Sequence, residues 1–154
     1  MGSENKLTGG CLCGAVRYEA IGDALGTCHC HCERCRRSSG SAFTTAVEFP
    51  VEAVIWLKEQ PASYRSSESA NRLFCPHCGS SVAHHWVDIS TMWPFIGTLD
   101  NPESVTPEFH LYTKEQLSWV KLDDGLPRHP AGPQQELGRM EMNPIRRRSN
   151  KPLA

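Results

Sequence analysis

Residues 75–79 read Cys75-Pro76-His77-Cys78-Gly79, with two cysteines three positions apart and a glycine directly after the second. This spacing suits a tight turn whose backbone amides face the sulfurs, and such a turn supplies half of a tetrahedral zinc site. A second pair occurs in Cys11-Leu12-Cys13-Gly14. Side chains at i and i+2 leave the same face of an extended strand, so both sulfurs can reach one ion. Together the two pairs predict a closed, structural zinc site with no position for a substrate, held by Cys11, Cys13, Cys75 and Cys78.

The motif at 75–78 has a competing interpretation. A Cys-x-x-Cys pair that opens a helix in a thioredoxin-like fold catalyses thiol–disulfide exchange. In this chain Gly79-Ser80-Ser81 and a strand-like segment at 82–87 follow the motif, and no βαβ pattern precedes it. The second cysteine pair can also complete a metal site. Zinc binding is therefore favoured over redox chemistry.

The richest segment is Cys28-His29-Cys30-His31-Cys32-Glu33-Arg34-Cys35. Cys30, Cys32 and Cys35 form a C-x-C-x-x-C array in which a strand end turns into a short helix. Three thiolates can then converge on one ion and leave its fourth position open, as in a catalytic zinc site. Thiolate ligands make the ion soft and favour a sulfur substrate. Two alternatives remain: Cys28 closes the site as a fourth ligand, or it is a buried thiol that packs as a small hydrophobe.

Five histidines are candidates for a role near these cysteines. His29 and His31 would point to the opposite face of an extended segment, where either could donate a proton. Only one of His84 and His85 can face the site from a later strand. His110 could line the cleft. For each of them, an exposed or packed histidine without a site role is the more common case.

The composition describes one soluble globular domain. The chain has 154 residues, of which 39% are hydrophobic and 21% charged, and its net charge is -1. This balance lacks the basic character of a nucleic-acid-binding domain. The longest apolar run, at 53–57, is far shorter than the ~20 residues of a membrane span. The first ten residues have no apolar core and do not form a secretory signal. We therefore expect a cytoplasmic protein without nucleic-acid or membrane partners, whose eight cysteines serve as metal ligands rather than disulfides.

Short alternating segments broken by Gly, Pro and Ser predict a mostly β domain over 9–130. Residues 1–8 are expected to be a flexible N-terminus. Residues 131–154 are expected to form an irregular tail, whose Arg146-Arg147-Arg148 cluster is more readily a solvated terminus than an anion or nucleic-acid site. Helical segments are expected at 33–38 and 113–117. Strands are expected around Val16 and Tyr18 and at 42–49, 54–57, 63–66, 72–75, 82–87 and 95–99.

Three motifs follow one another in a fixed order: Gly9-Gly10-Cys11-Leu12-Cys13-Gly14-Ala15-Val16-Arg17-Tyr18, then Cys30-His31-Cys32-Glu33-Arg34-Cys35-Arg36-Arg37-Ser38-Ser39-Gly40, then Phe74-Cys75-Pro76-His77-Cys78-Gly79-Ser80. Further matching positions are Gly97-Thr98-Leu99-Asp100, Pro107 to His110, Trp119 and Asp124-Gly125-Leu126-Pro127. With these motifs the chain resembles the glutathione-dependent formaldehyde-activating enzyme family, which also includes centromere protein V. The resemblance covers about residues 9–130, and Cys28 lies outside the pattern.

The resemblance implies a β-tent fold of short antiparallel sheets joined by a structural zinc. In that family the counterparts of Cys11, Cys13, Cys75 and Cys78 hold the structural zinc, and those of Cys30, Cys32 and Cys35 hold a catalytic zinc. We therefore expect two zinc ions per chain. The implied activity is that of a carbon–sulfur lyase that forms S-hydroxymethylglutathione from glutathione, or another small thiol, and a small electrophile such as formaldehyde. The alternatives are a zinc-stabilised binding or scaffold protein, as centromere protein V suggests, and a glutathione carrier without catalysis.

Overall fold

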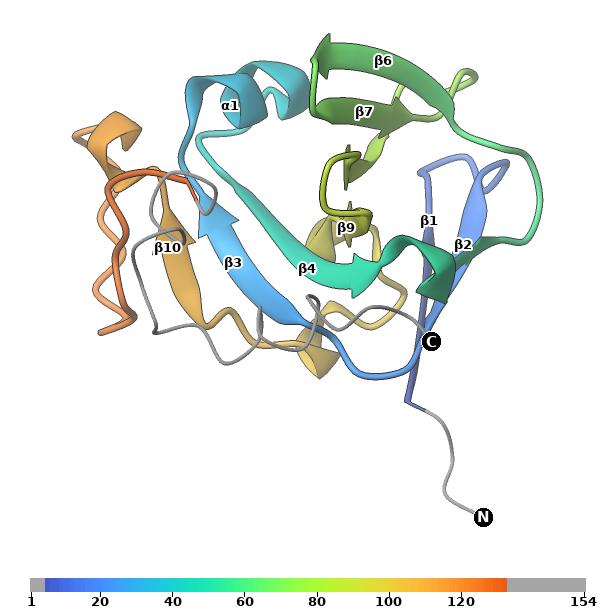
Figure 1. The fold of residues 1–154 in the computed structure, drawn as a ribbon, viewed down its shortest axis with the longest axis horizontal. Helices are drawn as coiled ribbons and strands as arrows, with labels where there is room; N and C mark the ends of the chain where they lie inside the picture. Colours follow the sequence, from blue (N-terminus) through green and yellow to red (C-terminus); the bar gives the residue numbers. More distant parts are fainter. Residues whose placement is uncertain (1–4, 133–154) are drawn as a thin grey trace.

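The computed structural model describes residues 5–132, which form ten strands, one α-helix and four short 3-10 helices. Three strands make a small antiparallel sheet in the order β1-β2-β5: β1 (Lys6–Gly10), β2 (Arg17–Ile21) and β5 (Val54–Trp56) (Figure 1). The mostly β class predicted from the sequence is confirmed. Within the described part of the chain, no helix is long and apolar enough to cross a membrane.

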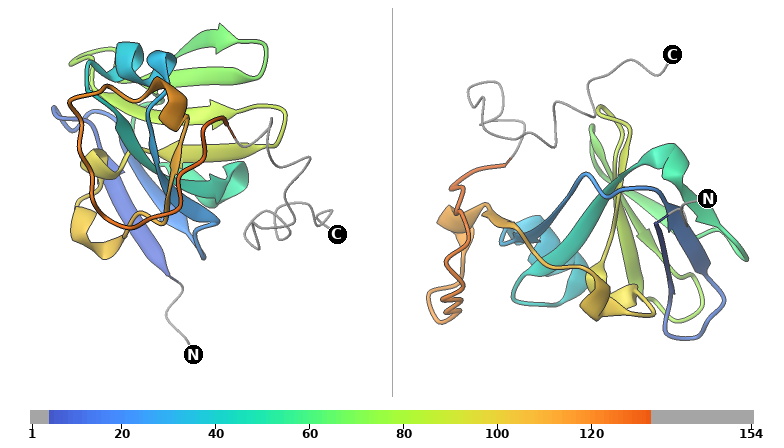
Figure 2. Two further views of the ribbon diagram at one scale, coloured as in Figure 1. Left: turned by 90° about the vertical axis from the view of Figure 1, so that its left-hand side faces the viewer. Right: turned by 90° about the horizontal axis from the view of Figure 1, so that it is seen from below.

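A second sheet of seven strands has the order β10-β3-β4-β9-β8-β7-β6. All of its neighbours are antiparallel except β10 and β3, which run parallel. In the right-hand view of Figure 2, the dark-blue strands β1 and β2 and the light-blue helix α1 lie on opposite sides of the green strands. The bounds are β3 (Gly26–Cys30), β4 (Thr44–Pro50), β6 (Ala62–Ser67), β7 (Ala70–Phe74), β8 (Ser81–Trp86), β9 (Thr91–Pro94) and β10 (Phe109–Leu111).

The α-helix, α1 (Glu33–Ser39), begins and ends at residues that the sequence motif contains. The Cys32 sulfur caps its N-terminus by accepting a hydrogen bond from the Cys35 amide at 3.3 Å. Gly40 ends the helix with φ 69°, a left-handed conformation that favours glycine, and donates its amide to the Arg36 carbonyl. The helix agrees with the segment predicted at 33–38.

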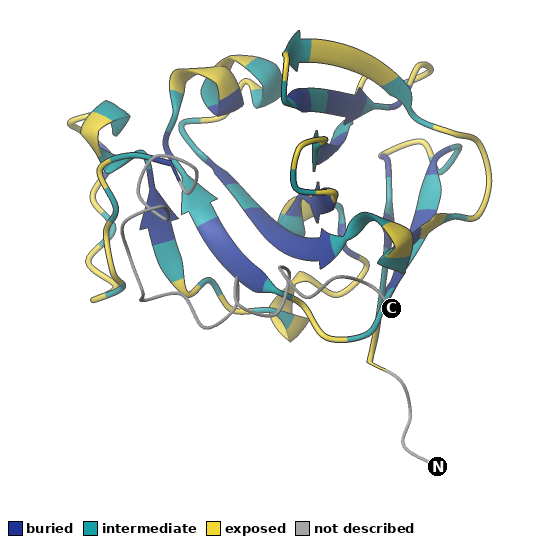
Figure 3. Cartoon of the chain, viewed as in Figure 1, coloured by how far each residue is buried: buried dark blue, intermediate teal, exposed yellow. Residues whose placement is uncertain are grey.

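The larger hydrophobic core lies between the two sheets and contains buried residues of β2 on one side and of β4 and β8 on the other; Figure 3 colours the buried parts of the chain dark blue. Tyr18 is fully buried in it, and its hydroxyl lies 2.7 Å from that of Thr98. A second, smaller cluster packs around Trp93 on the far side of β4 and includes Cys28 and Leu111. The core therefore fixes β3, β4 and β8, the strands that position the cysteines and histidines described below.

The structure differs from the sequence-based expectations in several segments; among them, β9 and β10 were not expected as strands. Residues 6–8, expected to be flexible, belong to β1, because their backbone pairs with β2 from Lys6 to Gly10. Residues 95–99, expected to be a strand, contain the 3-10 helix Ile96–Thr98, because the Thr98 hydroxyl and amide both turn back to the Phe95 carbonyl. The segment at 113–117 is shorter than expected, a 3-10 helix at Thr113–Glu115. Most of the tail predicted at 131–154 lies outside the described residues.

Candidate metal centres and the adjoining pocket

The first cluster joins the two sheets. Cys11 and Cys13 follow β1 of the small sheet, whereas Cys75 and Cys78 follow β7 of the large sheet. Their four sulfurs lie within 4.8 Å of one another, with Cys11 and Cys13 separated by 3.5 Å and Cys13 and Cys75 by 3.7 Å. The structure thus brings together the two pairs that the spacing predicted to share one ion.

This geometry fits a tetrahedral thiolate site. Zinc–sulfur bonds of about 2.3 Å place the sulfurs of such a site roughly 3.8 Å apart. Backbone amides face the sulfurs: Val16 donates to Cys11 at 3.3 Å, and His77 donates to Cys75 at 3.4 Å. The hydroxyl and amide of Ser80 lower the pKa of Cys78 to about 5, which favours the thiolate that a metal requires.

The redox interpretation of the motif at 75–78 finds no support in its local structure. The motif is a turn between β7 and β8 rather than the start of a helix. Gly79 occupies the turn with φ 75°, a conformation that a residue with a side chain rarely adopts. All eight cysteines lie within the described residues, and none of them forms a disulfide.

The second cluster is built where β3 passes into α1. Cys30 is the last residue of β3, Cys32 caps the helix, and Cys35 lies in its first turn. The three sulfurs lie within 4.8 Å of one another, and Cys28 is not part of this group. Cys28 is instead 2% exposed in the cluster around Trp93. The structure therefore brings together three cysteines rather than four, and the closed four-cysteine alternative is not supported.

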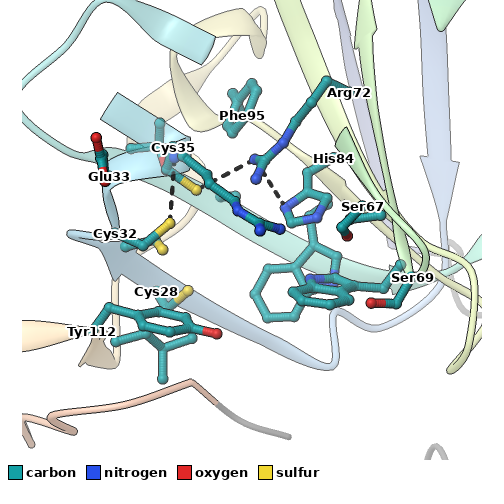
Figure 4. A pocket seen from close by; sticks show the side chains of 18 of the residues that line it. Cys28, Cys32, Glu33, Cys35, Ser67, Ser69, Arg72, His84, Phe95 and Tyr112 are labelled. Carbon is teal, nitrogen blue, oxygen red and sulfur yellow. Dashed lines mark hydrogen bonds between the residues drawn. The ribbon is translucent and has the colours of Figure 1, made fainter. Parts of the chain in front are cut away.

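A cavity of about 590 Å³ adjoins the three-cysteine cluster (Figure 4). Trp86, Trp93 and Phe95 contribute apolar surface to its lining, and charged side chains such as Glu33 and Arg34 also line it. This combination of apolar walls and a few polar groups is typical of a small-molecule site.

Arg72 and His84 approach the cavity from β7 and β8. The Arg72 guanidinium is 9% exposed and donates through Nη1 to the Cys35 sulfur at 3.4 Å. The same nitrogen lies 3.4 Å from His84 Nδ1. The thiols of Cys30 and Cys32, together with His84 and Arg72, hold the pKa of Cys35 well below its ordinary value. Cys35 is thus surrounded by groups that favour its thiolate form.

The contact with Arg72 also holds the His84 ring in place, with Nδ1 of the ring 3.4 Å from Nη1 of the guanidinium. Burial lowers the pKa of His84, which favours the neutral form of the ring. His84 Nε2 is buried and has no hydrogen-bond partner within residues 5–132. His84 is one of the polar residues that line the cavity.

The family model for the glutathione-dependent formaldehyde-activating enzyme matches residues 6–115 of the 154-residue chain. The chain belongs to this family. An uncharacterised lyase of Schizosaccharomyces pombe is 35% identical over 77 residues, which are 50% of this chain and 56% of the relative, so the match spans little more than half of that lyase. A Halomonas elongata protein, provisionally named a glutathione-dependent formaldehyde-activating enzyme, is 26% identical over 132 residues, 76% of this chain and 81% of the relative.

A solved structure shows the same fold. The crystal structure of a Rhodobacter sphaeroides protein matches with a TM-score of 0.50 and 20% sequence identity, and the match covers 79% of this chain and 98% of that one. At this identity the likeness concerns the fold alone.

The remaining candidate histidines of this family member lie away from the cavity. His29 and His31 occupy the opposite face of the β3 segment from the cysteines, as predicted, and neither lines the cavity. His110 does not line it either, contrary to its suggested place in the cleft, because β10 pairs with β3 and buries the ring completely beside His31. Of the neighbours His84 and His85, the structure places His84 in the cavity wall.

Arg72 was not singled out from the sequence. Arg72 lies in a segment that the sequence predicts to be a strand, and its side chain is buried there. That burial becomes evident only once the pairing of β7 with β8 is known.

Proposed function

We propose that this family member is a zinc-dependent enzyme that forms or breaks a carbon–sulfur bond, with glutathione or another small thiol as one substrate. The observation that carries the proposal is the contrast between the two clusters. The four-cysteine cluster has a full set of ligands, whereas the three-cysteine cluster has one ligand fewer and opens on a cavity lined by polar groups. We assign a structural zinc to Cys11, Cys13, Cys75 and Cys78, and a catalytic zinc to Cys30, Cys32 and Cys35.

The proposed reaction adds the thiol to formaldehyde to give S-hydroxymethylglutathione. Cys30, Cys32 and Cys35 would hold the zinc ion, which would supply a coordination position for the thiol and lower the thiol's pKa toward neutral. A carbon–sulfur bond forms, the carbonyl π bond breaks, and the thiol proton ends on the former carbonyl oxygen. The reverse direction is a carbon–sulfur lyase reaction.

The chain's own contribution is a preorganised set of hydrogen-bond donors. Arg72 holds the Cys35 sulfur and, through the same nitrogen, fixes the His84 ring. His84 lines the same cavity, and we assign its ring N–H to the oxygen on which negative charge develops as the thiolate attacks. A donor held in place beforehand stabilises that charge without reorganising during the reaction. The apolar wall of Trp86, Trp93 and Phe95 limits water around the reacting atoms.

The test compares the rate of S-hydroxymethylglutathione formation with and without the zinc-loaded protein, because formaldehyde and thiols also combine spontaneously. We expect acceleration that Cys32→Ser abolishes. Cys28→Ser is the matched control, since Cys28 lies on the same strand outside the cluster, and it should retain glutathione binding, activity and two thiolate-bound metal ions. Glutathione binding without acceleration would identify a carrier, and zinc content without glutathione binding would identify a scaffold protein; either result overturns the proposed activity.

A further inference from the structure

A third group of ligand-type side chains lies on the face of β3 that points away from the cysteines. His29 of β3 and His110 of β10 are direct partners in the parallel register, so their side chains emerge on the same side. Asp124 reaches them from the segment after the last 3-10 helix. The ligand atoms of these three residues lie within 4.8 Å of one another. We propose that His29, His110 and Asp124 form a third metal site, which takes a divalent first-row ion through two imidazole nitrogens and one carboxylate.

Outer hydrogen bonds orient both imidazoles for this role. His29 Nδ1 lies 2.8 Å from the Thr45 hydroxyl, which leaves Nε2 as the ligand atom. His110 Nδ1 lies 2.9 Å from His31 Nε2, and this leaves His110 Nε2 facing Asp124 at 2.9 Å. Metal-bound histidines characteristically use their second ring nitrogen in this way, because the outer partner sets the ring's orientation and tautomer.

The carboxylate is positioned in the same manner. Asp124 Oδ1 accepts the Leu126 amide at 3.1 Å, and both carboxylate oxygens face His110 Nε2, Oδ1 at 3.2 Å and Oδ2 at 2.9 Å. The Asp124 side chain is 31% exposed, so an ion from solvent can reach the group although His110 is completely buried. The Arg128 charge nearby opposes a cation, but its guanidinium is directed to the Gln116 side chain and the Leu122 carbonyl.

The donor set distinguishes this site from the two cysteine clusters. Two imidazoles and one carboxylate suit zinc or iron(II) and leave coordination positions for water, whereas thiolates favour softer ions. An ion here would connect β3, β10 and the segment around Asp124. That segment contains no regular strand between Leu111 and the end of the described residues, so the ion would act as a clip that holds it against the sheet.

The experiment uses the full chain, first loaded with zinc and then dialysed against micromolar cobalt(II). Cobalt bound to nitrogen and oxygen shows only weak visible bands, whereas cobalt on thiolates adds an intense near-ultraviolet charge-transfer band. We expect three metal ions per wild-type chain by elemental analysis and two for Asp124→Asn and for His29→Gln. The difference spectrum between wild type and each variant should contain the weak bands without the charge-transfer band.

Asp123→Asn is the matched control, because it removes one negative charge from the neighbouring exposed position and should retain three ions. Far-ultraviolet circular dichroism of each variant checks that the fold is kept. If either Asp124→Asn or His29→Gln does not fold, the other still tests the site. Two ions per wild-type chain, or a third ion that persists in both variants, would overturn the proposal and identify the group as a hydrogen-bonded Asp–His–His chain only.

Discussion

At the scale of single residues, neighbours decide what a cysteine or histidine can do. Cys28 and Cys30 are two positions apart on β3, yet Cys28 packs with Trp93 and Leu111, whereas Cys30 lies in the three-cysteine cluster. His84 and His85 are adjacent on β8, and only His84 lies in the wall of the cavity. The chemistry of each residue therefore depends on which side chains the fold brings to it.

His84 is the residue whose replacement separates catalysis from binding. We expect His84→Ala to lower the rate of adduct formation by about 100- to 1,000-fold, because the proposed donor to the developing oxyanion is lost. Glutathione affinity should change by no more than about threefold, since the cysteines that carry the proposed zinc remain. Steady-state rates and isothermal titration of glutathione measure the two effects.

Two further variants check that prediction. His84→Gln keeps a side-chain N–H and should recover part of the rate, whereas His85→Ala should behave like wild type. Equal losses of rate in His84→Ala and His84→Gln, or a rate unchanged in both, would contradict the role of the ring N–H donor.

At the scale of elements, β1 is held by close backbone approach as well as by strand pairing. Gly9 pairs with Tyr18 of β2 and bridges to Leu99, so the 3-10 helix Ile96–Thr98 lies directly against β1. Arg17 clamps the same region through both carboxylate oxygens of Asp100, at 2.9 and 2.5 Å. These contacts place Cys11 and Cys13 directly after a well-anchored strand rather than in a flexible N-terminal segment.

Gly9→Ala tests this close approach. A Cβ atom at Gly9 would lie 2.4 Å from the Tyr18 hydroxyl oxygen and 2.5 Å from the Thr98 carbonyl oxygen, and neither atom can move without disturbing the core. We expect a loss of about 1–3 kcal/mol in the free energy of unfolding. Gly97→Ala is the control, because a Cβ there meets no atom within 4 Å. Denaturant unfolding of the two variants measures the difference; equal stabilities would argue against the packing.

At the scale of the whole molecule, the two cysteine clusters close loops of very different length. The four-cysteine cluster connects the small sheet to the large one and joins positions more than sixty residues apart, from Cys13 to Cys75. The three-cysteine cluster spans only residues 30–35, at one strand end and one helix start. An ion that closes a long loop removes more conformational freedom from the unfolded chain than one that closes a short loop.

Cys75→Ala and Cys32→Ser should therefore have different effects on folding. We expect Cys75→Ala to lose one metal ion and its cooperative thermal transition, because metal-binding free energy is part of the folding free energy. Cys32→Ser should lose the other ion yet keep most of its melting temperature. Elemental analysis and differential scanning calorimetry measure both quantities. If Cys75→Ala kept its metal and melting temperature, the structural assignment of the four-cysteine cluster would be wrong.

The mostly β class, the short helix after Cys32 and the closeness of the cysteines within each motif can be predicted from the sequence. These are consequences of local geometry. Alternation places Cys11 and Cys13 on one face of an extended segment, and the turn at 75–79 brings its two sulfurs together whatever surrounds them. Prolines and glycines likewise limit element length locally.

The tertiary fold sets which distant side chains meet at each site. Arg72 and His84 reach Cys35 because β7 pairs with β8 across the cavity from α1, and His29 meets His110 because β10 joins β3 in parallel. It also decided that residues 6–8 form a strand and that residues 95–99 do not. Strand pairing across long loops depends on the total burial of the sheets rather than on the period of any one segment, so no local pattern in the sequence encodes it.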